Sequence, residues 1–244
     1  MRSPTRLAAA ASAEALAFAD LLDGLDAERR TAPTPCAGWS IDDLATHVAT
    51  AAFRDAEALH RARLGSASPP GELDVEGVDL AGAIRLAVDH LRAALDNPPA
   101  QWPAVPTPFG SYPVADALQC LVIEFGVHLD DLRVAAGDRD AEFSPATLDA
   151  LFGFGDLYLL LQATPLEGEP ITFILAAPSA AMSVTWTGRH WTRGTGAARE
   201  CRISGSDDAI ARLMLRRLDV TDPRIDVLDP GHLAPLFASA IRPL

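Results

Sequence analysis

The chain contains no lysine, only three cysteines, and no apolar run long enough to span a bilayer. Three cysteines without regular spacing argue against a disulfide framework and favour a reducing cytoplasm. The 20 basic residues are therefore all arginine, and 33 acidic residues outnumber them, which gives a formal net charge of -13. Such a charge argues against nucleic acid as a partner, because its phosphates would be repelled. The missing apolar run likewise argues against a membrane partner.

Several common motifs of catalysis are also missing. The sequence has no Gly-rich phosphate loop, no paired Cys-x-x-Cys, no His-Glu-x-x-His and no Gly-x-Ser-x-Gly. Residues 1–11 carry two arginines and several alanines, as a secretory signal would. Acidic Glu14 and Asp20 interrupt the continuation, so we expect the start of a helix there instead. The remaining composition, with 49% hydrophobic and 22% charged residues over 244 positions, is typical of a soluble globular chain.

The hydrophobic pattern changes along the chain. Up to Gly137 the apolar residues recur at helical spacing, and beyond about residue 163 they alternate as in strands. We predict an α+β fold in which a four-helix bundle, residues 1–140, precedes a linking helix and a small α+β domain, residues 141–244. The helices are expected at 6–30, 40–64, 78–95, 114–136, 144–163, 207–218 and 232–240, the strands at 171–176, 182–187, 199–203 and 224–228, and an irregular connection at 97–113.

The segment 116–132 holds the most informative residues. Glu124 and His128 are four apart, so on a helix they project from one face and can grip one metal ion. A histidine from a neighbouring helix can complete a three-ligand site with open positions, and His47 lies on an earlier predicted helix. The competing interpretation is a buried carboxylate that is paired with His128 through a hydrogen bond and binds no metal. Taken alone, a histidine such as His47 is more often an ordinary buried side chain than a metal ligand.

Three neighbouring residues have two interpretations each. Asp131 lies on nearly the same helix face as His128 and can accept the ring N–H that fixes the tautomer of a ligand histidine, or it belongs to an exposed acidic pair with Asp130. Cys120, one turn before Glu124, is a fourth ligand or a small buried residue, and we favour the latter. Cys36 precedes a helix whose dipole would lower a thiol pKa, yet an inert packed cysteine is favoured because no base is identifiable beside it.

Two longer segments together resemble a known family. Thr34-Pro-Cys-Ala-Gly-Trp-Ser40, followed by Asp43-Leu44 and His47, is similar to the opening signature of the mycothiol-dependent maleylpyruvate isomerase family. The segment Glu124-x-x-x-His128-x-x-Asp131-Leu132 resembles its second signature, and Pro108–Leu118 resembles the approach to it. The resemblance covers most of the first 140 residues. It implies a DinB-like metal-binding bundle followed by a sterol-carrier-like domain.

The resemblance also implies a site. It assigns His47, Glu124 and His128 to a divalent metal, usually zinc, at which the thiol cofactor mycothiol is thought to bind. The family pattern has a glycine before an arginine at the end of a Leu-rich helix, and that arginine is linked to substrate binding. Here Leu215-Arg216-Arg217-Leu218 lacks the glycine. Either Arg216 or Arg217 is thus the candidate substrate anchor.

The leading hypothesis is a metal-dependent enzyme that uses a thiol cofactor. A metal-bound thiol ionises readily and can attack a small electrophilic substrate, as in an isomerase or an S-transferase. The partners would then be a small-molecule thiol and that substrate. Two alternatives remain, a metal-dependent hydrolase whose nucleophile is bound water, and a binding protein without catalytic activity. If activity depends on a thiol, the hydrolase alternative is disfavoured. If the metal keeps a position that exchanges ligands, the non-catalytic alternative is disfavoured.

Overall fold

The structure is a computed structural model that describes residues 3–71, 77–96, 98–108, 110–138, 140–229 and 232–242. The chain divides into two compact units, residues 1–147 and 148–244, which are described separately below. The predicted domain boundary at residue 140 stays a prediction. The predicted α+β class is confirmed, since the structure combines helices with two sheets. Among the described residues, no helix has both the length and the apolar character needed to cross a bilayer.

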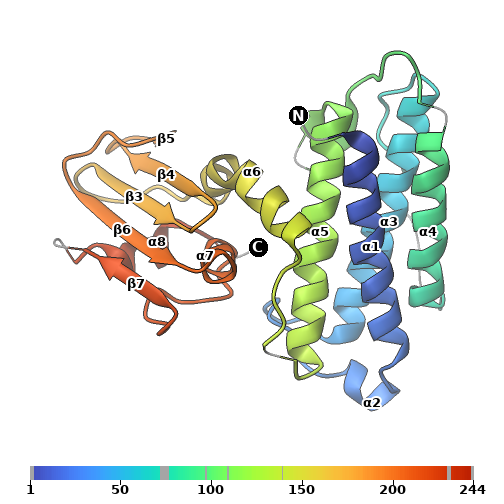
Figure 1. Ribbon diagram of the computed structural model, residues 1–244, viewed down its shortest axis with the longest axis horizontal. Coiled ribbons are helices and arrows are strands. Elements are labelled where there is room, and N and C mark those ends of the chain that lie inside the picture. The colour runs from blue at the N-terminus through green and yellow to red at the C-terminus, as the bar shows by residue number, and fades with distance from the viewer. Residues whose placement is uncertain are drawn as a thin grey trace. The chain divides into compact units, whose positions relative to one another are not determined.

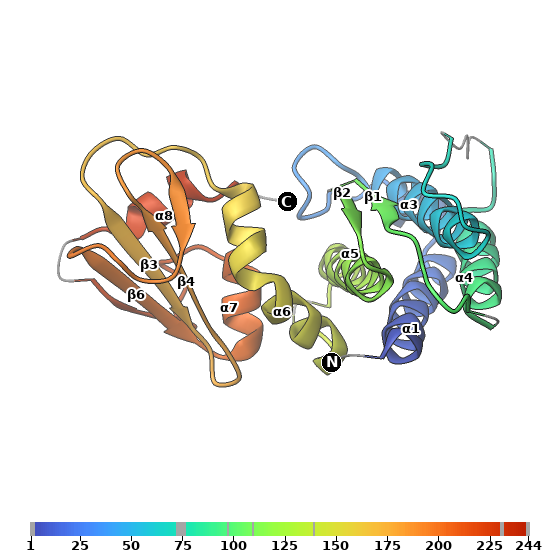
Figure 2. The same ribbon diagram turned by 90° about the horizontal axis from the view of Figure 1, so that it is seen from above.

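Four long helices form the first unit (Figure 1). They are α1 (Pro4–Asp23), α3 (Ile41–Arg63), α4 (Leu80–Asp96) and α5 (Val114–Ala135). Helix α1 packs against α4 and α5, and α3 packs against the other sides of the same two helices. The view down the helices in Figure 2 shows them as the four corners of a bundle. Their apolar faces close a core that is rich in alanine, which lets the helix backbones approach closely.

Local sequence signals explain where these helices begin and end. Ser40 caps α3: its Oγ accepts a hydrogen bond from the Asp43 N–H, and the Asp43 side chain accepts one from the Ser40 N–H. Helix α5 ends before Gly137, whose φ of 101° is open to glycine and costly for other residues. The expected single helix over 6–30 is wrong at its end. Asp26 caps a separate short helix, α2 (Ala27–Arg30), directly after the end of α1.

The connection before α5 contains a small hairpin. Strands β1 (Val105–Thr107) and β2 (Gly110–Tyr112) pair antiparallel, with Val105 opposite Tyr112. The prediction of an irregular segment over 97–113 is therefore wrong for these residues, although part of the segment lies outside the described residues. Prolines normally weaken a strand assignment, but a two-stranded hairpin has only edge strands, where a missing N–H is tolerated. The hairpin contacts both α3 and α5.

Helix α6 (Pro145–Gln162) begins in the first unit, at a buried polar contact with α1. The Ser144 and Thr147 hydroxyls both hydrogen-bond to the carboxylate of Glu14, which is 8% exposed. Gly126 of α5 allows this approach, because a Cβ atom there would lie 2.2 Å from the Thr147 Oγ1. The contact fixes the start of α6 against the middle of α5.

The second unit is a five-stranded sheet with three helices. Its strands run in the order β5-β4-β3-β6-β7, and only the pair β3–β6 is parallel. Apolar side chains from α6, α7 and α8, including Leu159, Leu213 and Phe237, share one core with the strands. Strand β5, a three-residue strand, is absent from the predicted set. The bounds are β3 (Ile171–Ala176), β4 (Ala181–Trp186), β5 (Trp191–Arg193), β6 (Glu200–Gly205), α7 (Asp207–Met214), β7 (Ile225–Leu228) and α8 (Ala234–Ala240).

Candidate metal centre

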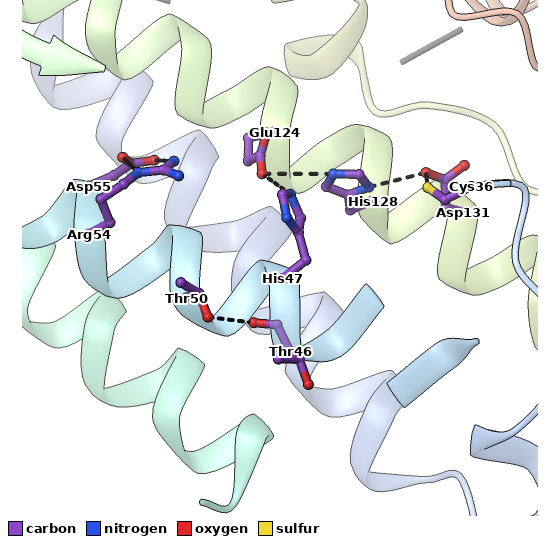
Figure 3. A network of polar contacts seen from close by, with 9 residues as sticks. All are labelled: Cys36, Thr46, His47, Thr50, Arg54, Asp55, Glu124, His128 and Asp131. Atoms are coloured by element: carbon purple, nitrogen blue, oxygen red, sulfur yellow. Dashed lines mark hydrogen bonds and ion pairs between the residues drawn. The ribbon is translucent and has the colours of Figure 1, made fainter. Parts of the chain in front are cut away.

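The bundle brings His47, Glu124 and His128 together in one cluster (Figure 3). Helix α3 supplies His47, and α5 supplies the other two side chains, one turn apart on the same face. Each residue offers one ligand atom, and these atoms all lie within 4.8 Å of one another. The His47 Nε2 is 2.8 Å from the Glu124 Oε1, and the His128 Nε2 is 3.7 Å from the same oxygen. One carboxylate oxygen therefore lies between two imidazole nitrogens.

The three side chains differ in exposure. The side chain of His128 is 6% exposed, that of Glu124 20% and that of His47 36%. Trp39, in the loop before α3, packs beside this group with its ring tilted, and its ring centroid is 4.9 Å from that of His47 and 6.5 Å from that of His128. The cluster is therefore shielded from solvent on the side of His128 and accessible to solvent on the side of His47. A metal centre with an open coordination position needs such access.

A second polar cluster lies behind His128. The His128 Nδ1 donates to the Asp131 Oδ2 at 3.1 Å, and the Cys36 thiol donates to the same oxygen at 3.2 Å. Asp131 is fully buried, and Asp130 is only 2% exposed, so the alternative of an exposed acidic pair is wrong. A carboxylate at Nδ1 holds the ring with Nε2 directed at Glu124 and His47. Figure 3 shows His128 between Glu124 on one side and Asp131 with Cys36 on the other.

Cys36 is the residue whose surroundings the sequence did not indicate. It is buried, and its thiol contacts a carboxylate from a helix 95 positions later in the chain. Cys36 is packed as predicted, but a carboxylate lies beside it that the sequence did not reveal, and the inertness of the thiol stays a prediction. Cys120 is half-buried and belongs to neither ligand cluster among the described residues. Burial raises the pKa of the Cys120 thiol to about 12, and the charges of Asp55 and Glu124 add to this effect.

Charges around the cluster favour a bound cation. Burial by itself raises the pKa of Glu124, but the His47 hydrogen bond and the charge of His128 outweigh it and lower the value to about 2. Burial lowers the pKa of His128, while the contacts with Asp131 and Cys36 and the charge of Glu124 outweigh it and raise the value to about 10. Two carboxylates thus stabilise positive charge at His128. Two imidazole nitrogens and a carboxylate, backed by a second carboxylate, fit the donor set that divalent zinc takes in proteins.

The two arginines of the second unit follow α7 directly. Arg216 has a φ of 60°, in the left-handed region that glycine adopts without strain. Two of its guanidinium nitrogens, Nε and Nη1, are buried and have no hydrogen-bond partner among the described residues. Burial raises the pKa of the Tyr158 hydroxyl, and the positive charge of Arg217 opposes this rise in part. Arg217 therefore lies near a buried phenol on α6.

Comparison with known proteins identifies the family of the chain. Residues 11–133 match the profile of the mycothiol maleylpyruvate isomerase N-terminal domain. This match runs from within α1 to near the end of α5 and includes all three residues of the cluster. The chain belongs to this family. A comparison with curated protein sequences finds no significant match.

Solved structures of the mycothiol maleylpyruvate isomerase family share the fold of the whole chain. The crystal structure of the mycothiol-dependent maleylpyruvate isomerase superposes with a TM-score of 0.67 at 19% identity, over 93% of each chain. A crystal structure of a histidine-to-alanine mutant of that enzyme gives a TM-score of 0.69 at 18% identity, again over 93% of each chain. At this identity the likeness establishes the fold alone.

Proposed function

We propose that this protein is a metal-dependent enzyme that uses a thiol cofactor, mycothiol, and acts on a small electrophilic substrate as an isomerase or S-transferase. The observation that carries the proposal is the convergence of His47, Glu124 and His128 in a member of this family. A divalent ion, which we propose to be zinc, would lower the pKa of a thiol that coordinates it. His47 and His128 would hold that ion through Nε2, and Glu124 through a carboxylate oxygen.

The surrounding residues have separate roles in this proposal. Asp131 keeps the His128 proton on Nδ1, which leaves Nε2 available as a ligand. Trp39 covers the imidazole rings of His47 and His128 and limits the access of water to them. Glu124 keeps the carboxylate form at neutral pH, because its pKa is far below 7. All of these residues lie in the first unit, so the proposed ligand set is complete within the bundle.

The proposed substrate anchor is Arg217. The family pattern places a glycine before its arginine, and the glycine-favouring φ of 60° falls on Arg216. We therefore propose that Arg216 takes the place of the glycine in the pattern and Arg217 the place of the arginine. We expect Arg216→Gly to be tolerated, since it relieves the left-handed backbone. We expect Arg217→Gln to raise KM for an acidic substrate without changing metal affinity, and exposed Arg189→Gln serves as the control.

The experiment on the metal centre begins with metal analysis of protein purified without chelator. We expect one zinc per chain in the native protein, and none in His47→Ala, which should stay folded because the helices have apolar faces of their own. His60→Ala is the matched control, a histidine of the same helix outside both clusters. Circular dichroism reports folding. Full metal content in His47→Ala would contradict the ligand assignment.

Thiol dependence tests the reaction type. Titration of mycothiol into protein loaded with cobalt(II) is expected to produce the intense near-ultraviolet absorption of a cobalt–thiolate bond. The same titration into His47→Ala should produce none. Turnover of electrophilic substrates without any thiol would instead support the hydrolase alternative and overturn the role of mycothiol.

A further inference from the structure

A small cavity adjoins the cluster inside the bundle. It lies between α3, α5 and the β1–β2 hairpin, and His47 and Glu124 form part of its wall. Its volume is about 160 Å³. A molecule in this space would be next to the open side of the cluster, because His47 is the most exposed of the three side chains.

Most of the remaining wall is apolar. Leu59, Val105, Ala117 and Leu121 line it and are each less than 5% exposed. Cys120 completes this surface from α5, and its thiol stays protonated because burial raises its pKa to about 12. The wall offers no second nucleophile that would compete for an electrophile. Such a surface suits hydrocarbon, which gains free energy in proportion to the apolar area it buries.

An ion pair forms part of the cavity wall. The Arg54 Nε donates to the Asp55 Oδ1 at 2.7 Å and its Nη2 to the Oδ2 at 2.8 Å, a bidentate geometry that fixes the side chain. Arg54 also lines a second, larger space of about 550 Å³, which includes Thr50 and residues 69–71. The two spaces share Arg54 and residues 106–108. Arg54 and residues 106–108 therefore form a shared boundary of the small cavity at the cluster and the larger space, and Figure 3 shows Arg54 and Asp55 on the same helix as His47.

The volume sets the size of the occupant. An apolar protein cavity of roughly 150 Å³ is known to hold one benzene molecule. We propose that this cavity binds the body of the electrophilic substrate, and that the substrate is a small, largely apolar molecule of about the size of one six-membered ring. We expect fused rings to bind less tightly, because they exceed the volume of about 160 Å³. This inference rests on the proposed function and adds the substrate class to it.

The test uses three carboxylates as probes of the zinc-loaded full-length protein. Isothermal titration is expected to show benzoate binding at least tenfold more tightly than acetate, which has no apolar body, and than 1-naphthoate, which has a second ring. The absorption spectrum of the cobalt-loaded protein provides a second measurement that does not depend on activity. Equal affinities for the three probes would overturn the inference.

A substitution that fills the cavity tests whether benzoate binds there. Ala117→Leu adds three carbon atoms to the wall and is expected to weaken benzoate binding at least tenfold, with zinc content and acetate binding unchanged. Ala115→Leu is the matched control, on the same helix but outside the cavity wall. If Ala117→Leu does not fold, Cys120→Leu fills the same space from a half-buried position. Native benzoate affinity in a folded variant of either kind would overturn the inference.

The two proposals fail in different ways. If benzoate binds and Ala117→Leu blocks it, yet mycothiol supports no turnover, the proposed function is wrong and the cavity assignment stands. If mycothiol supports turnover and Ala117→Leu leaves KM unchanged, the proposed function stands and the cavity assignment is wrong.

Discussion

Neutralising Asp131 is expected to flatten the pH dependence of zinc binding. The pKa of His128 is raised to about 10, and Asp131 contributes to this through both a hydrogen bond and its charge. In chelator-stripped protein, zinc must therefore displace a proton from His128 at every pH below that value. The competition weakens binding about tenfold for each pH unit, which amounts to about a thousandfold, or about 4 kcal/mol, at pH 7.

Asp131→Asn removes the charge and keeps the shape of the side chain. The pKa of His128 should then fall toward the usual imidazole value of about 6.5, so the variant should lose most of the slope between pH 7 and 9. At pH 10 the native protein should bind more tightly, because an oriented histidine gives about 10–100-fold higher metal affinity. Chelator competition at several pH values measures the slope, and calorimetry in two buffers counts the protons released.

The raised pKa of His128 also predicts how the stability of the zinc-free protein depends on pH. A pKa raised in the folded state stabilises the fold fully below the unfolded value of about 6.5, and this stabilisation is lost as pH rises toward about 10. Urea unfolding of the native protein should show this decline, by up to about 1.4 kcal/mol per pH unit, and Asp131→Asn should show less of it. Asp42→Asn, an exposed change of equal charge on α3, is the control. Equal slopes in Asp131→Asn and the native protein would refute the reasoning.

Two further substitutions test contacts that support the site. Cys36→Ala removes the thiol that donates to Asp131, so zinc affinity should fall a few-fold in chelator competition, less than for a direct partner of a ligand. Cys36→Ser keeps a hydrogen-bond donor to Asp131 and should restore the zinc affinity. If the serine variant binds zinc as weakly as the alanine variant, Cys36 contributes through packing and not through its hydrogen bond. Gly126→Ala should lower stability by about 1–3 kcal/mol in thermal melts, because the new Cβ would meet the side chain of Thr147 at 2.2 Å. Gly82→Ala, in α4, is its control, since there the Cβ meets only the movable end of a side chain, and an equal loss of stability would contradict the steric explanation.

Local patterns in the sequence were sufficient for much of the bundle. The cap at Ser40 and the glycine at 137 mark helix ends through interactions within a few residues, which is why α3 and α5 could be predicted closely. The relation of Glu124 to His128 follows from helix geometry alone. That His47 meets them depends on the packing of α3 against α5, and only the family signatures indicated it.

Contacts between distant segments could not be predicted in the same way. The thiol of Cys36 and the carboxylate of Asp131 are 95 positions apart, and neither lies in a pattern that points to the other. The β1–β2 hairpin was missed because its prolines normally indicate a loop, and its strands have only three residues each. The cavity has no sequence signal, since its volume is what remains after side chains from three elements have packed.

The position of the hairpin has a consequence for the proposed substrate binding. It forms one wall of the cavity, through Val105 and residues 106–108, yet none of its described residues belongs to either ligand cluster. Substitutions in this short segment can reshape the cavity while α3 and α5 keep His47, Glu124 and His128 in place. If the cavity binds the substrate as proposed, substitutions at a few hairpin positions would change which substrate fits and would leave the three proposed metal ligands in place.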